Sequence, residues 1–430
     1  MRFYSTNNTG HFVSLKEAVT KGLAPDKGLY MPEKIPKLSA SFIASMPELS
    51  FQEIGYEVIG ALLSDDLDAG QIKELVDHTL AFDAPLVKIE DDVFALELFH
   101  GPTLAFKDFG ARFCSKLMSF LLEGQKVKVL VATSGDTGSA VANGFFDVPG
   151  VEVIILYPAG KVSVLQEKQF TTLGGNITAL EVEGNFDDCQ RLVKQAFGDE
   201  DLNAKMLLTS ANSINIARWM PQCLYYFYAY SRLPTKEKVV FSVPSGNFGN
   251  LAAGMLAEQM GLPISAFVAA TNSNNVVPQY LEGFPFSAKA SVQTISNSMD
   301  VGDPSNFPRL LALYGGDEDR LKAMVKGYYY DDIATQTAMQ KVNARFGYTM
   351  DPHGAVAYLG LKDFLEANKG FTGVFLETAH PGKFREVVEK SLGAKITLPD
   401  RLARFLIGNK EAISLGKEYK DFKEFLMMGR

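Results

Sequence analysis

The stretch "VKVLVATSGDTGSAVANGFFDVPGVEVIILYP", residues 127–158, decides the fold class of this chain. A short run rich in β-branched residues is followed by a loop of small polar residues, a helical segment and a second β-branched run. That order is typical of two parallel strands joined by a helix that covers the sheet. Because ligands bind at the carboxyl ends of parallel strands, the loop at 133–137 is the first place to look for a site.

The same alternation continues along the chain and predicts an α/β fold. Residues 1–85 lack it and are predicted to form a separate, mixed but mostly helical N-terminal region. Residues 86–430 are predicted to form the main body, with helices flanking its sheets. The further runs that predict strands are "ITALEVEG", "KMLLTS", "KVVFSVP", "ISAFVAAT" and, at 373–378, "GVFLET".

Composition limits the function classes that remain. The chain has 430 residues and a formal net charge of -8, which argues against a general nucleic-acid binder. The start "MRFYSTNNTG" has no signal-peptide pattern, and no run of about 18 apolar residues predicts a membrane span. The three scattered cysteines and five histidines show no disulfide framework and no metal spacing. We therefore expect a cytoplasmic protein with no metal, nucleic-acid or membrane partner.

One lysine stands out, in "HGPTLAFKDFGARF" at residues 100–113. Asp108 can cap a helix whose apolar stripe begins with Phe109 and Phe113, so Lys107 is expected at the helix entrance, facing a cleft lined by loops. Most lysines beside apolar residues keep the ammonium in water. A desolvated lysine instead loses its proton near neutral pH and can attack a carbonyl group.

A second loop, residues 245–250 in "VVFSVPSGNFGNLAAGM", has the strand, glycine-rich loop and helix order of a phosphate site. Gly246 and Gly249 are expected to let the phosphate approach the backbone and to adopt positive φ. The alternative is a simple tight turn.

Two further loops carry candidate anion ligands. The hydroxyls and amides at 133–137 suit a carboxylate, although Ser, Thr and Asp are also common helix caps. In "TSANSINIARWM", Arg218 can either clamp a phosphate or form an ordinary surface ion pair.

Nucleotide binding is not supported. No two glycines in the chain are separated by a single residue, so the dinucleotide fingerprint is absent. "HPGKF", residues 380–384, has Phe384 where a P-loop requires Ser or Thr. A reactive lysine, a phosphate cradle and an anion loop instead suggest a cofactor with both an aldehyde and a phosphate, which describes pyridoxal 5'-phosphate.

These segments resemble the threonine synthase family, fold type II pyridoxal-phosphate enzymes. The matching blocks are "HGPTLAFKDFGARF", "ATSGDTGSAVA", "SANSINIAR", "VPSGNFGN" and "ETAHPGKF", and the resemblance covers nearly the whole chain. It implies parallel and mixed sheets with flanking helices, in two α/β subdomains with the cofactor between them. It also implies conversion of O-phospho-L-homoserine and water to L-threonine and phosphate, the last step of threonine biosynthesis.

The resemblance also implies roles for individual residues. Lys107 would form an imine with the cofactor, the 245–250 loop would hold its phosphate, and Thr378 would hydrogen-bond the ring nitrogen. Asp136 departs from the Asn of many relatives, and its charge would repel substrate unless it is paired. The implied cofactor ligands are Lys107, Ser245, Gly246, Asn247, Phe248, Gly249, Asn250 and Thr378; the implied substrate ligands are Thr133, Ser134, Asp136 and Thr137 for the carboxylate, and Asn212, Ser213 and Arg218 for the phosphate.

Three other functions stay open at this point. A related phospho-lyase would use the same chemistry but release 2-oxobutyrate. A dehydratase or β-replacing relative would act on serine-type substrates, which need no phosphate clamp. A non-catalytic protein could bind a phosphate ligand without turning it over. The sequence does not indicate the oligomeric state.

Overall fold

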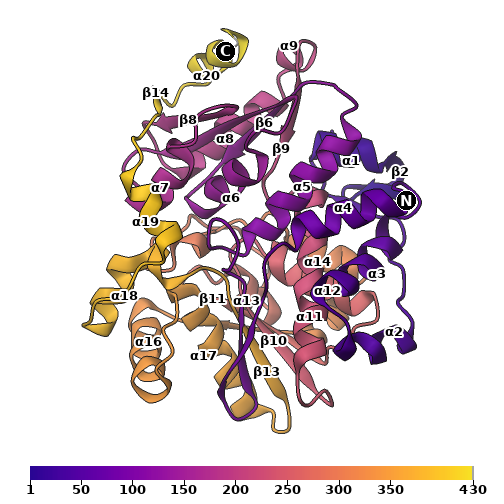
Figure 1. Ribbon diagram of the computed structural model, residues 1–430, viewed down its shortest axis with the longest axis vertical. Helices are drawn as coiled ribbons and strands as arrows, with labels where there is room; N and C mark the ends of the chain where they lie inside the picture. The colour runs from indigo at the N-terminus through magenta and orange to yellow at the C-terminus, as the bar shows by residue number, and fades with distance from the viewer. Residues whose placement is uncertain (429–430) are drawn as a thin grey trace.

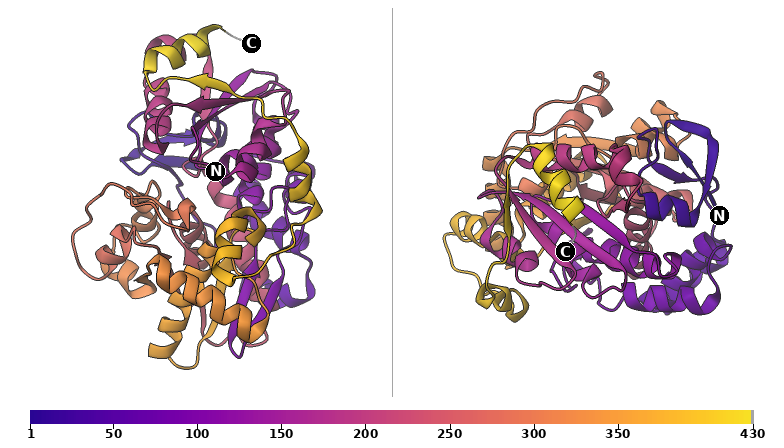
Figure 2. Two further views of the ribbon diagram at one scale, coloured as in Figure 1. Left: turned by 90° about the vertical axis from the view of Figure 1, so that its left-hand side faces the viewer. Right: turned by 90° about the horizontal axis from the view of Figure 1, so that it is seen from above.

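The computed structural model describes residues 1–428 and divides most of the chain between two sheets, each covered by helices on both faces. Figure 1 shows the smaller sheet in the upper half of the molecule and the larger one in the lower half, and Figure 2 shows the same two parts from the side. Seven runs that the sequence predicts as strands are strands in the structure, so the α/β prediction is confirmed.

The smaller sheet has the strand order β14-β8-β7-β6-β9, and all its pairings are parallel. Alternate residues of its strands face opposite sides: Val129 and Val131 face the main core, whereas Leu130 and Ala132 face a second core beneath α8 and α20. Its strands are β6 (Val127–Ala132), β7 (Val151–Pro158), β8 (Ile177–Val182), β9 (Leu207–Ser210) and β14 (Ile413–Leu415); its helices are α5 (Lys107–Leu121), α6 (Asp136–Phe145), α7 (Val164–Thr171), α8 (Phe186–Phe197), α9 (Glu200–Asn203), α10 (Ile216–Trp219), α19 (Asp400–Ile407) and α20 (Tyr419–Met428).

The larger sheet has the order β12-β11-β10-β13-β5-β4, parallel except for β4, which runs antiparallel to β5. Helix α17 packs on β10, β11 and β13, and α16 packs on α17. The strands are β4 (Leu86–Glu90), β5 (Val93–Glu97), β10 (Val239–Pro244), β11 (Ala266–Thr271), β12 (Val325–Tyr329) and β13 (Thr372–Glu377); the helices are α11 (Leu224–Arg232), α12 (Gly249–Gln259), α13 (Val276–Leu281), α14 (Phe307–Leu313), α15 (Glu318–Met324), α16 (Asp332–Phe346), α17 (Pro352–Ala367) and α18 (Arg385–Leu392).

The N-terminal region is less helical than the sequence predicts. It contains a three-stranded antiparallel sheet of order β2-β1-β3 in addition to four α-helices, two of which begin with capping boxes. The strands were missed because they are short and β2 is mostly exposed, so their apolar residues do not alternate. The elements are β1 (Arg2–Ser5), β2 (Asn8–Ser14), β3 (Tyr30–Pro32), α1 (Leu15–Lys21), α2 (Ala40–Ser45), α3 (Phe51–Leu63) and α4 (Ala69–Thr79).

Four short 3-10 helices complete the described elements. They are η1 (Met46–Glu48), η2 (Met220–Cys223), η3 (Asn297–Met299) and η4 (Pro381–Phe384). Across residues 1–428, none of the helices is both long enough and apolar enough to cross a membrane.

Candidate active site

Lys107 is the first residue of α5, but the predicted cap is wrong. Asp108 lies inside the first helical turn, and the capping position belongs to Phe106, which makes no side-chain cap. The buried Asp108 carboxylate instead accepts hydrogen bonds from the Thr103 amide at 2.8 Å and the Thr103 hydroxyl at 2.5 Å. Asp108 therefore holds the preceding loop against the start of the helix. A negative charge at this end of a helix also interacts favourably with the helix dipole.

A short backbone bridge brings the start of α5 to the end of β13. The amide of Phe106 donates to the carbonyl of Thr378 at 2.9 Å, and the amide of His380 donates to the carbonyl of Leu104 at 3.1 Å. The hydroxyl of Thr378 makes no hydrogen bond to any residue from 1 to 428 and is available to a ligand.

The surroundings of Lys107 favour the neutral amine. Burial lowers the pKa of Lys107 to about 8; the nearby Asp136 carboxylate opposes this, while the positive charges of Lys383 and Arg218 lower the pKa further. The Lys107 nitrogen lies 5.6 Å from the centre of the Phe106 ring. Near neutral pH, a far larger fraction of Lys107 than of an ordinary lysine is therefore neutral and able to act as a nucleophile or base.

The 245–250 loop offers a row of free backbone donors. It connects β10 to α12, and α12 begins without a side-chain cap. Within the described part of the chain, the backbone N–H groups of residues 246–251 donate no hydrogen bond. Unpaired amides at a helix N-terminus attract anions, because the helix dipole adds to their own partial charges. The loop therefore has the donors that a phosphate requires.

The reason for the glycines in this loop differs from the prediction. The positive φ belongs to Phe248, at 60°, and not to Gly246 or Gly249. A Cβ on Gly246 would lie 2.8 Å from the Met299 Cα and 2.9 Å from the Ser298 carbonyl oxygen. Gly246 is thus needed for close packing of the 298–299 backbone on the loop.

The polar side chains of the loop mostly shape it from within. Ser245 donates to the Val243 carbonyl at 2.9 Å, and Asn247 accepts from the Ser305 amide at 3.2 Å. The Asn250 side-chain oxygen accepts from the hydroxyls of Tyr225 and Tyr226, whereas its buried Nδ2 has no partner. These two tyrosines are fully buried in the core.

At the 133–137 loop, the hydroxyl groups divide into two roles. The Thr133 hydroxyl accepts from the amides of Gly135 at 2.9 Å and Gly138 at 2.8 Å, so it serves as a helix cap. The hydroxyls of Ser134 and Thr137, and the amides of residues 134, 136 and 137, make no hydrogen bond within residues 1–428. These groups, at the N-terminus of α6, can receive a carboxylate.

The concern about the charge of Asp136 is answered by a residue that sequence reasoning missed. Lys383, from η4, forms an ion pair with Asp136 at 2.7 Å, and both side chains are buried. Burial alone would raise the pKa of Asp136, but Lys383 and Lys107 outweigh it and hold that pKa well below its usual value. The sequence signal for Lys383 was its place in "HPGKF", which was tested as a P-loop and matched within the block "ETAHPGKF", but no role was assigned to the lysine.

The third loop places Arg218 inside the protein. Arg218 is 2% exposed and donates to the Ala211 carbonyl, while its Nε has no partner. Burial lowers the pKa of Arg218 to about 10, so it stays charged at neutral pH. Among residues 1–428 no carboxylate lies within ion-pair distance of it, which argues against the surface ion pair and leaves a buried charge able to bind an anion.

The neighbours of Arg218 hold the third loop in place. Asn212 donates to the Ala132 carbonyl at 2.9 Å, which ties the loop to the end of β6. Ser213 accepts from Asn306 at 3.1 Å, and a second buried arginine, Arg309, donates to the Ser213 carbonyl at 2.9 Å. Nothing in the local sequence indicated Arg309, because its contacts with this loop, at the Ser213 and Ile214 carbonyls, join segments about 95 residues apart.

Sequence reasoning also missed two neighbouring buried carboxyl groups behind the site, those of Asp351 and Glu377. Asp351 contacts the Nδ1 of His353 at 2.5 Å, and the His353 Nε2 accepts from the Ser298 amide at 3.2 Å. Burial and the neighbouring Asp351 raise the pKa of Glu377 well above its usual value, which favours its protonated form. This chain of contacts supports the 298–299 backbone that packs on Gly246.

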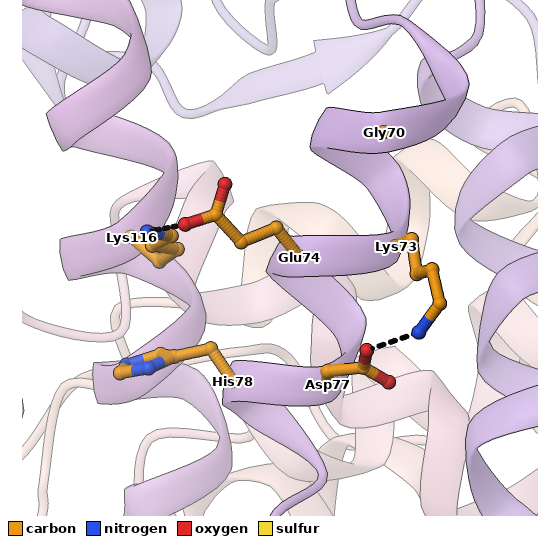
Figure 3. A pocket seen from close by; sticks show the side chains of 6 residues that line it. All are labelled: Gly70, Lys73, Glu74, Asp77, His78 and Lys116. Atoms are coloured by element: carbon orange, nitrogen blue, oxygen red, sulfur yellow. Dashed lines mark hydrogen bonds and ion pairs between the residues drawn. The ribbon is translucent and has the colours of Figure 1, made fainter.

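Two cavities lie outside this cluster. A surface groove between α4 and α5 is lined by residues that mostly pair with one another, such as Lys73 with Asp77 at 2.6 Å (Figure 3). It includes Lys116, about 13 Å along α5 from Lys107 at 1.5 Å per residue, and we assign it no chemistry. A cavity of about 810 Å³ lies near the bridge, and Leu104 and His380 line it.

Comparisons with known proteins agree with this geometry. A family model described as pyridoxal-phosphate dependent enzyme matches residues 79–373. Models for the threonine synthase N terminus and the C-terminal part of threonine synthase match residues 2–80 and 354–426.

Individual relatives match almost end to end. Threonine synthase of Escherichia coli strain K12 is 47% identical over 94% of each chain. The crystal structure of the Escherichia coli threonine synthase superposes with a TM-score of 0.95 at 44% identity and covers 100% of both chains. A threonine synthase from Brucella melitensis with bound PLP gives a TM-score of 0.92 at 33% identity, covering 100% of this chain and 99% of that one.

Proposed function

The chain belongs to the threonine synthase family, and we propose that Lys107 and the three loops around it form its catalytic centre. The protein is a pyridoxal-phosphate-dependent enzyme that converts O-phospho-L-homoserine and water to L-threonine and phosphate. One chain of contacts carries the placement of the centre, because it links the Lys107 amine, whose pKa is lowered, to a helix start with free amides. Asp136, which acts on Lys107, contacts the Ser298 hydroxyl at 3.4 Å, and the Ser298 backbone packs on Gly246 of the 245–250 loop. An aldehyde and a phosphate on one cofactor match that pair of features.

The cofactor fits groups that lack partners inside the protein. The amine of Lys107 would hold the aldehyde, the amides of residues 246–251 would hold the phosphate, and the Nδ2 of Asn250, which has no partner among residues 1–428, would offer a further donor. The free hydroxyl of Thr378 takes the ring nitrogen, and because it is neutral it does not hold that nitrogen protonated. When bound, pyridoxal 5'-phosphate withdraws electrons from the substrate carbon skeleton and acidifies its α- and β-protons.

Two loops would bind the two anionic ends of the substrate. The carboxylate meets the free amides and hydroxyls at Ser134 and Thr137, where Lys383 neutralises the charge of Asp136. The phosphate meets Arg218, whose buried charge has no carboxylate partner, with Ser213 and Asn212 beside it. Clamping both ends orients the carbons between them toward Lys107.

Lys107 would move the protons. With the cofactor and substrate in place, the Lys107 amine could take the α-proton and deliver it to another substrate atom, because its lowered pKa lets it exchange a proton near neutral pH. Arg218 stabilises the charge of the departing phosphate. The closed, buried setting of both groups keeps bulk water away until it is needed at the β-carbon.

We also place the N-terminal region at residues 1–85 and the catalytic body at residues 86–430. The cofactor would lie between the subdomains built on the two sheets. All three cysteines are buried and unbonded, which supports a cytoplasmic setting.

The decisive experiment supplies O-phospho-L-homoserine and measures phosphate, threonine and 2-oxobutyrate together. We expect threonine and phosphate in nearly equal amounts with little 2-oxobutyrate. Phosphate matched by 2-oxobutyrate would indicate the lyase, and turnover of serine alone would remove the phosphate role from Arg218. Borohydride reduction followed by peptide mapping should find the cofactor on Lys107; Lys116, on the surface of the same helix, is the internal control.

A further inference from the structure

One carboxylate in the candidate active site has two ammonium neighbours. Asp136 contacts the nitrogen of Lys383 at 2.7 Å, the amide of Gln166 at 2.9 Å and the hydroxyl of Ser298 at 3.4 Å. Lys107 is the second cation that acts on Asp136, and Asp136 in turn acts on Lys107. A single negative charge between two lysines can form a close ion pair with one and leave the other free.

The geometry assigns the close pair to Lys383. Its side chain is 0% exposed and also donates to the Thr103 carbonyl at 2.9 Å, so two contacts hold the ammonium at Asp136. The pair joins η4 to the N-terminus of α6, segments about 245 residues apart. It thereby connects the C-terminal part of the chain to the loop that would bind the substrate carboxylate.

The other charged groups nearby cannot replace Asp136 as the partner of either lysine. Arg218, on α10, adds positive charge near Lys107, and His380 lies near Lys383 with a pKa lowered by burial to about 4, so it is neutral. Asp108, on α5, is the other carboxylate that acts on Lys383, but it is occupied by Thr103.

We infer that Lys383 is a positioning residue that occupies Asp136 and so keeps Lys107 from forming an ion pair with it. Lys107 then remains a free amine, available to the cofactor aldehyde. The inference rests on the proposed role of Lys107. Without Lys383, the carboxylate of Asp136 would attract the Lys107 ammonium and favour its protonated form. The N-terminus of α6 would also carry an uncompensated negative charge where the substrate carboxylate must bind.

The test measures protonation of Lys107 directly in the full-length chain freed of cofactor. Acetic anhydride acetylates only neutral amines, so the rate of Lys107 acetylation, followed by mass spectrometry across pH 6 to 10, reports its pKa. The wild-type rate should be half-maximal near pH 8. In Lys383→Met the midpoint should rise by roughly one to two pH units, within the sampled range, which is the effect of an opposite charge at close range.

Three variants separate this inference from a general loss of structure. Lys383→Arg keeps the charge and should restore the wild-type midpoint in full or in large part. Asp136→Asn/Lys383→Met removes both charges and should bring the midpoint back to the wild-type value or lower. Lys423→Met breaks a partly buried ion pair between α20 and Asp199, at 2.8 Å, and should leave the midpoint unchanged.

An unchanged midpoint in folded Lys383→Met would overturn the inference, as would a raised midpoint that persists in the double variant. If Lys383→Met does not fold, Asp136→Asn alone decides, because loss of the carboxylate should lower the Lys107 midpoint; no change would again overturn it. These readouts do not depend on which lysine binds the cofactor. Borohydride mapping answers that question separately, so failure of the proposed function can be told from failure of this inference.

Discussion

The two helix starts that form anion sites are built in different ways. The loop before α12 presents six consecutive free amides, at residues 246–251, and has no charged side chain of its own. The loop before α6 presents fewer free amides and contains a buried carboxylate, which is neutralised by a lysine from η4. The first site is therefore local in sequence, whereas the second requires a distant segment to fold against it.

This difference matters for what each loop can do. Backbone amides are always donors, so the 246–251 loop can hold a dianionic phosphate at any working pH. The 133–137 loop depends on the charge balance of Asp136 and Lys383, so its affinity for a carboxylate can be changed by one substitution on another segment. Fixed donors suit a resident cofactor, and a balanced charge pair suits a substrate that must enter and leave.

The largest expected effect distinguishes the role of Lys107 in catalysis from the role of the 246–251 amides in cofactor binding. Lys107→Ala should lower kcat by roughly 10²- to 10⁴-fold or more, because the variant lacks both the amine and the acid–base group. It should still bind pyridoxal 5'-phosphate through the 246–251 amides, without an imine that borohydride can reduce. Equilibrium dialysis and absorbance spectra check both points, and complete loss of cofactor binding would show that these amides do not suffice.

The next prediction tests Arg218, whose charge belongs to neither the 246–251 loop nor the 133–137 loop. Arg218→Ala should reduce kcat/KM for O-phospho-L-homoserine by about 2 to 3 kcal/mol, the worth of a charge-assisted contact in a dry site. Cofactor affinity should stay the same, since the cofactor phosphate has its own donors. Steady-state kinetics and a cofactor titration measure the two quantities. A defect confined to cofactor binding would place Arg218 on the other phosphate.

A smaller effect tests how the amide loop is packed. Gly246→Val should weaken cofactor binding by about 1 to 3 kcal/mol, because its side chain would displace the Met299 and Ser298 backbone. Gly249→Ala is the control: the nearest atom to its Cβ would be the Asn306 side-chain nitrogen at 3.3 Å, with no backbone atom closer, so the loss should be smaller. Equal losses in the two variants would contradict the packing explanation.

The smallest effect concerns the carboxyl pair that supports this loop from behind. Because the pKa of Glu377 is raised on folding, its contribution to stability is full below the unfolded pKa of about 4.3 and is lost as pH rises through the folded pKa. The side chain of Glu377→Gln stays neutral at every pH. At high pH the variant should therefore be more stable than the wild type, by about 1 kcal/mol of unfolding free energy, and should melt at a higher temperature, whereas at pH 4 the two proteins should differ little. Thermal melts at pH 4, 7 and 9 check this; a uniform loss at all three would mean that the carboxyl shape matters more than its charge.

Local rules predicted much of the molecule. The β-branched runs predicted β6, β7, β8, β9, β10, β11 and β13, because buried parallel strands are continuous apolar segments. Weak or exposed patterns were missed, as in the N-terminal sheet and in β12 and β14. The position of Lys107 at a helix start was predicted correctly, although Asp108 is not the cap.

The candidate site, like the fold, has features that the sequence predicted and features that it did not. The sequence by itself determined the fold class, the two glycine-containing loops and the lysine between aromatic residues, since strand, loop and helix patterns depend on neighbours a few residues apart. Only the tertiary structure decided that Asp136 is paired with Lys383, that Arg218 is buried without a carboxylate partner among residues 1–428, and that the pKa of Glu377 is raised. Burial and charge pairing arise between segments that are far apart in the chain, and no local pattern encodes which of them will meet.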